Sequence, residues 1–72
     1  MKLWIRSQDR ENLIPVSDTI YIIDTEIVYK YIITLAEYKT KERALEVLDE
    51  IQKYMLLPNP DGSAYVYQMP EE

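Results

Sequence analysis

The residues best suited to bind a ligand lie at 38–43, where three cations and a hydroxyl residue gather at the start of a predicted helix. Free amide groups and the dipole make a helix start a natural anion site. Cations are the wrong sign for that end of the dipole, so phosphate binding would explain their presence. Tyr38 is placed to stack on a base. The alternative reading is an ordinary solvated turn.

The predicted ligand-binding set extends this segment with residues of the N-terminal strand. Arg6 or Arg10 could supply one more phosphate contact from a neighbouring strand or subunit. The predicted set is Lys39, Thr40, Lys41, Arg43, Tyr38, Trp4 and Arg6.

The sequence contains few residues that could catalyse a reaction. There is no His and no Cys, which removes the usual nucleophile pairs, zinc ligand sets and neutral-pH bases. Asp49 and Glu50 are adjacent on a helix and point to different sides, while Asp24 and Glu26 belong to a turn. A single glycine excludes a glycine-rich phosphate loop. We therefore expect a protein that is not an enzyme and needs no metal or cofactor.

Length and charge narrow the class further. Seventy-two residues allow one domain, 1–72. The net charge of −5 disfavours general binding to nucleic acid. No segment is long and apolar enough for a signal peptide or a membrane span. We expect a cytoplasmic protein with no membrane partner.

Alternating apolar and polar residues predict five strands. The turn at residues 24–26 predicts an antiparallel hairpin between the third and fourth, and Pro15 confines the second to a short edge strand. The predicted strands are Lys2–Ser7, Leu13–Val16, Thr19–Asp24, Ile27–Leu35 and Ala64–Met69.

One helix follows Thr40, whose side chain can cap its first turn. Its apolar stripe consists of Ala44, Val47, Leu48, Ile51 and Met55. Leu56–Ser63 then turns the chain, with Asp61-Gly62 as the turn signal. The expected fold is α+β in the order β-β-β-β-α-β: a small antiparallel sheet of four to five strands with the helix on one face.

The sheet carries more apolar and aromatic side chains than one helix can cover. Three readings are open: a tight core with a few exposed tyrosines, a homo-oligomer, or a ligand or partner surface on the monomer. The residues predicted for an oligomer interface are Tyr29, Tyr31, Tyr65 and Tyr67.

Three segments, Met1–Gln8, Tyr38–Ile51 and Val66–Glu71, resemble small proteins of phages and prophages of Gram-positive bacteria. The resemblance implies a phage accessory protein that counters host processes by binding, and it supplies no catalytic residues. Members often carry a longer insert before the last segment than Leu56–Ser63, so the resemblance does not extend to a function carried by that insert.

The resulting first hypothesis is a non-enzymatic, homo-oligomeric phage protein that sequesters a nucleotide-type immune signal between subunits in the cytoplasm of the infected host. The second is an acidic inhibitor that mimics nucleic acid and binds a host nucleic-acid-binding protein. Its acidic face would comprise Glu42, Glu46, Asp49, Glu50, Glu71 and Glu72. The third is a purely structural phage protein.

Overall fold

The computed structural model describes residues 2–58 and 64–72, which form one helix and six strands. The elements in chain order are β1 Lys2–Arg6, β2 Leu13–Pro15, β3 Ile20–Ile23, β4 Glu26–Tyr29, β5 Ile33–Glu37, α1 Lys41–Met55 and β6 Ala64–Gln68. The α+β class is confirmed. The predicted turn at Asp61-Gly62 lies outside the described residues.

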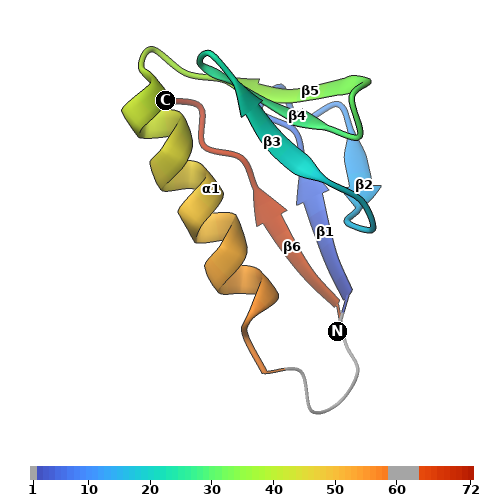
Figure 1. Cartoon of the computed structure of the whole chain (residues 1–72). Helices are drawn as coiled ribbons and strands as arrows, with labels where there is room; N and C mark the ends of the chain where they lie inside the picture. Colours follow the sequence, from blue (N-terminus) through green and yellow to red (C-terminus); the bar gives the residue numbers. More distant parts are fainter. Residues whose placement is uncertain (1, 59–63) are drawn as a thin grey trace.

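The strands form two three-stranded sheets rather than the single predicted one (Figure 1). In the first sheet β1 is central, antiparallel to β2 and parallel to β6. The expectation of a wholly antiparallel sheet was therefore wrong. Strand alternation shows which side chains share a face and carries no information on the direction of the partner strand. The prediction of a short edge strand containing Pro15 is confirmed.

The second sheet is an antiparallel meander of β3, β4 and β5. The predicted hairpin is confirmed at its first turn, where Ile23 pairs with Glu26. The predicted continuous strand Ile27–Leu35 was wrong, because the chain reverses at Lys30 and Tyr31. Both have positive φ, 56° and 65°, and the Ile32 amide donates to the Tyr29 carbonyl at 3.2 Å. Two positive-φ residues in a tight turn normally call for Gly or Asn.

The helix confirms the predicted cap and most of the predicted stripe. Thr40 is extended, and its side-chain oxygen accepts from the Arg43 amide at 3.1 Å. Ala44, Val47 and Ile51 are buried. Leu48 is only half-buried, and Met55 at the helix end is 37% exposed, so three of the five predicted stripe residues are buried.

One hydrophobic cluster joins both sheets to the helix. Its buried members are Leu3, Ile5, Ile27, Tyr29, Leu35, Ala36, Tyr38, Ala44, Val47, Ile51, Tyr67 and Met69. β1, β6 and the helix supply the lower part, and the meander supplies the upper part (Figure 1). After β6 the chain runs up beside α1, so the C-terminal residues lie next to the first helical turns. This arrangement creates the site described next.

Candidate functional site

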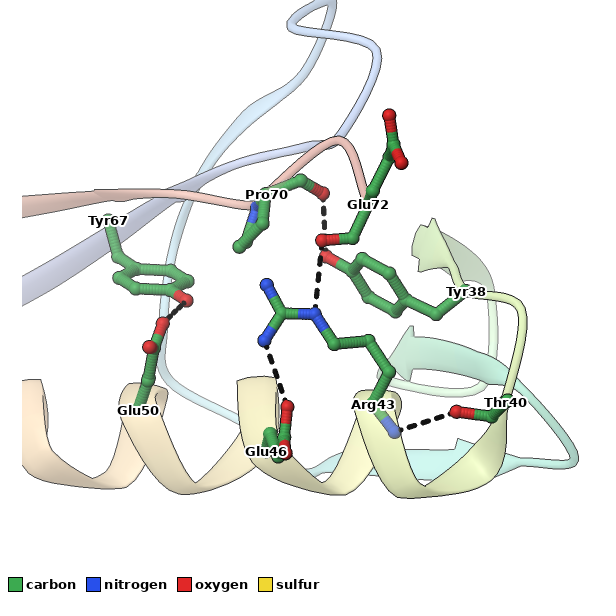
Figure 2. A network of polar contacts seen from close by, with 8 residues as sticks. All are labelled: Tyr38, Thr40, Arg43, Glu46, Glu50, Tyr67, Pro70 and Glu72. Atoms are coloured by element: carbon green, nitrogen blue, oxygen red, sulfur yellow. Dashed lines mark hydrogen bonds and ion pairs between the residues drawn. The ribbon is translucent and has the colours of Figure 1, made fainter.

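Arg43 is the centre of a polar network at the start of α1 (Figure 2). Its Nη1 donates to Glu46 Oε1 at 3.1 Å, and its Nε donates to the main-chain oxygen of Glu72 at 3.0 Å. The guanidinium carbon lies 5.9 Å from the centre of the Tyr38 ring, within the range of a cation–π contact. The side chain is 35% exposed. The guanidinium is thus held in place with part of its surface open to solvent.

Tyr38 forms the wall beside Arg43. The residue is buried, and its hydroxyl donates to the main-chain oxygen of Pro70 at 2.8 Å. Burial raises the pKa of Tyr38 to about 12, against the opposing effect of the Arg43 charge. The phenol therefore remains a neutral donor at physiological pH. Because its ring is packed in the core, only part of it faces outward.

An open pocket of about 420 Å³ adjoins these two residues and is lined by Glu37, Tyr38, Lys39, Arg43, Glu71 and Glu72. The size suits a small organic ligand. Three carboxylates oppose two cations, so the formal charge of the lining is −1. The structure thus brings three predicted ligand residues, Tyr38, Lys39 and Arg43, to one pocket, and surrounds them with acids that the sequence did not single out for it.

The other predicted ligand residues lie elsewhere in the described part of the chain. Thr40 is occupied as the helix cap, and Lys41 is exposed without lining the pocket. Trp4 and Arg6 lie on β1 and do not line the pocket. Arg10 is exposed in the turn after β1.

Gln8 is the residue at this end of the molecule that sequence reasoning missed. Its Nε2 lies within hydrogen-bonding distance of the main-chain oxygens of Glu37, Pro70 and Glu71, at 3.0, 3.2 and 2.8 Å. Its Oε1 accepts from the Glu37 amide at 3.0 Å. One side chain thereby fastens the end of β5 and residues 70–71 to the turn that follows β1. We call these contacts the Gln8 clamp.

The turn that carries Gln8 is itself closed by a buried serine. Ser7 is 1% exposed; its hydroxyl donates to Asp9 Oδ1 at 2.5 Å and accepts from the Asn12 amide at 3.1 Å. The hydrogen bond from Ser7, and a second from the Glu11 amide, lower the pKa of Asp9. The turn is therefore ordered by an ionised Asp9.

The predicted interface tyrosines divide between core and surface. Tyr29 is buried, and its hydroxyl donates to the Pro15 carbonyl at 3.2 Å. Tyr67 is buried and donates to Glu50 Oε1 at 2.5 Å; burial and this bond raise its pKa. Tyr65 is half-buried and donates to the Pro58 carbonyl. Tyr31 is 75% exposed and packs on Tyr21, with ring centres 5.1 Å apart.

Several large apolar side chains remain on the surface. The most exposed are Ile32 at 80%, Leu56 at 77% and Tyr31 at 75%. Ile32 and Tyr31 are neighbours in the β4–β5 turn. Val66 and Leu13, also exposed, lie on the outer face of the first sheet. The apolar surplus expected from the sequence is thus present as separate patches.

Within residues 2–58 and 64–72 there is no group of three potential metal ligands. The helix of the described chain is too short and too polar to cross a membrane.

Comparison with known proteins yields no relative: no family model, no curated protein and no solved structure matches this chain.

Proposed function

We propose that this chain is a phage accessory protein that captures a small nucleotide-type anion without chemical conversion, as a homo-oligomer, and thereby counters a host defence signal. The observation that carries the proposal is the pocket at the start of α1, where Tyr38, Lys39 and Arg43 meet. An aromatic wall, a fixed guanidinium and an exposed ammonium are a combination suited to nucleotides.

The geometry of Arg43 supports an oxyanion as the ligand. Its Nε already holds an oxygen, that of Glu72, at 3.0 Å, and its planar fork matches phosphate oxygens. Lys39 lies in the same lining and is exposed, so it can follow a ligand of variable shape.

Thermal shift with cyclic AMP and ADP tests the capture. Ligand at 100 times its Kd stabilises the folded protein by about 2.7 kcal/mol, which raises the Tm of a domain of this size by roughly 11–22 °C. Lys39→Gln should weaken binding about fivefold to tenfold, through loss of one charge-assisted contact. Lys53→Gln, the same charge change at the other end of α1, is the matched control. The proposal is rejected if neither nucleotide changes the Tm at about 1 mM, which is about 1,000 times a micromolar Kd.

The oligomer is proposed to form through the β4–β5 turn, where Tyr31 and Ile32 are the two neighbouring exposed side chains. Tyr31→Asn removes the aromatic ring and retains a residue that tolerates the positive φ of 65°. Together with Ile32→Ser it should convert an oligomer to a monomer in light scattering. Leu45→Ser, at an exposed leucine of the helix, should not. A wild-type protein that is monomeric at high micromolar concentration would remove the oligomer from the proposal.

One observation favours the second hypothesis, an acidic inhibitor of a basic host protein. Three glutamates, Glu37, Glu71 and Glu72, line the same pocket with only two cations, so the formal side-chain charge of the lining is −1. Such a surface should bind a purified basic nucleic-acid-binding protein in a salt-sensitive way and be displaced by duplex DNA. It should also ignore nucleotides, which separates the two functions.

A further inference from the structure

Glu71 and Glu72 occupy the groups that an anionic ligand would need. The Glu72 main-chain oxygen accepts from Arg43 Nε at 3.0 Å, and the Glu71 main-chain oxygen accepts from Gln8 Nε2 at 2.8 Å. Both glutamates are exposed and both line the pocket. Figure 2 shows the main chain of Glu72 directly over the guanidinium.

From this geometry we infer that Glu71–Glu72 is a strap that competes with the ligand for Arg43. The inference rests on the proposed capture of an anion at this pocket. The strap supplies an oxygen where a phosphate oxygen would bind, and its two carboxylates add repulsion. When it leaves, the lining changes from three carboxylates against two cations to one against two, so the formal charge rises from −1 to +1.

The two residues before the strap are held in place, so only the strap itself has to move when a ligand binds. Met69 is completely buried, and its amide donates to the Arg6 carbonyl at 3.0 Å. The Pro70 carbonyl accepts from the Tyr38 hydroxyl at 2.8 Å and from Gln8 Nε2 at 3.2 Å. The strap, by contrast, is held by one bond at each residue. Its release therefore leaves the core and the Tyr38–Pro70 contact in place.

The consequence is a site that binds weakly while closed and more tightly once the strap is displaced. A ligand must offer more than Glu72 does, which a group with several oxygens and a full negative charge achieves by bidentate contact with the guanidinium. Glu72 contacts the guanidinium through one oxygen at Nε alone. The strap thereby favours phosphate-containing anions over small neutral acceptors.

Calorimetric titration with inorganic pyrophosphate, and separately with ADP, tests the strap. The double variant Glu71→Gln/Glu72→Gln keeps the main-chain oxygens and removes the repulsion. We expect it to bind both probes at least tenfold more tightly than the wild-type protein. Glu11→Gln/Asp49→Asn changes the net charge equally at exposed positions that do not line the pocket, and it should bind no more than twofold more tightly than the wild-type protein. Adding Arg43→Gln to the strap variant should abolish the gain.

The outcomes separate the two proposals. Equal affinity of the wild-type protein and the strap variant overturns the strap while leaving anion capture intact. Equal gains in the strap variant and the charge control overturn it as well, because the effect would then be one of net charge. No binding of either probe to any variant overturns both.

Discussion

The Gln8 clamp should contribute a measurable share of the stability of this small domain. Gln8 has four contacts at 2.8–3.2 Å, three of them from Nε2. That nitrogen carries two hydrogens and can donate two full hydrogen bonds. With the bond that Oε1 accepts, Gln8 makes about three bonds at full strength. With a net value of about 0.5–1.5 kcal/mol each, and a discount for solvent access, Gln8→Ala should lower the free energy of unfolding by about 2 kcal/mol. The Tm should fall by about 10 °C.

Urea unfolding followed by circular dichroism measures this loss, with Gln52→Ala as the control. Gln52 is an exposed helix residue, and its replacement by alanine should change stability by less than about 0.5 kcal/mol. Equal stability of the two variants would refute the reasoning, since it would mean that water replaces the clamp without loss.

The variant Gln8→Glu separates the clamp from simple packing, because it is nearly the same shape. It keeps the acceptor for the Glu37 amide and loses both donor hydrogens, so a carboxylate faces three carbonyl oxygens. Its neutral form is favoured in the folded protein, and its pKa rises above the ordinary value. The folded state then binds more protons than the unfolded state above about pH 4. Stability relative to wild type should therefore fall as pH rises from 4 to 7, and a loss independent of pH would contradict this account.

Three further predictions concern the core, the cap and titration. Ile51→Ala in the buried stripe should cost about 2–5 kcal/mol in denaturant unfolding, whereas Leu45→Ala, at 46% exposure, should cost less than about 1 kcal/mol. Thr40→Ala should cost about 1 kcal/mol, and Thr40→Ser should restore most of it. Because the pKa of Asp9 is lowered, its contribution is present above about pH 4 and lost as pH falls through its folded pKa. In the variant Asp9→Asn the free energy of unfolding should fall less steeply as the pH is lowered below about 4. Urea unfolding midpoints at each pH measure this difference.

The sequence was sufficient to predict those elements that depend on neighbouring residues in the chain. Thr40 followed by a helical apolar stripe located α1 and its cap, and Pro15 identified an edge strand. The Asp24 turn was also recognisable, because Asp tolerates its positive φ of 54°. The turn at Lys30 and Tyr31 carried no such residue. It forms because the hairpin brings Ile27, Tyr29 and Leu35 to one core, a gain made by packing across strands.

The candidate site was predictable only where it depends on side-chain chemistry. Tyr38, Lys39 and Arg43 could be chosen because aromatic and cationic groups beside a helix start suggest an anion. The approach of Glu71 and Glu72 could not, because Gln8 and Arg43 hold main-chain oxygens. Such acceptors are the same in every residue, and they lie 63 and 29 positions away from their donors in the chain. The pattern of residue types along the chain therefore cannot predict the contacts of Gln8 and Arg43 with these oxygens.

Residues from three distant parts of the chain meet at one end of the fold. β1 and β6 pair in parallel, and α1 packs across both. Gln8 follows β1, Tyr38 precedes α1 and Pro70 follows β6, and the side chains of Gln8 and Tyr38 both contact the Pro70 carbonyl. β2, β3 and β4 supply none of the lining of the pocket. Substitutions in β3 and β4 should therefore leave the pocket lining intact as long as Ile27 and Tyr29 stay in the core, whereas β5 contributes Glu37 to that lining.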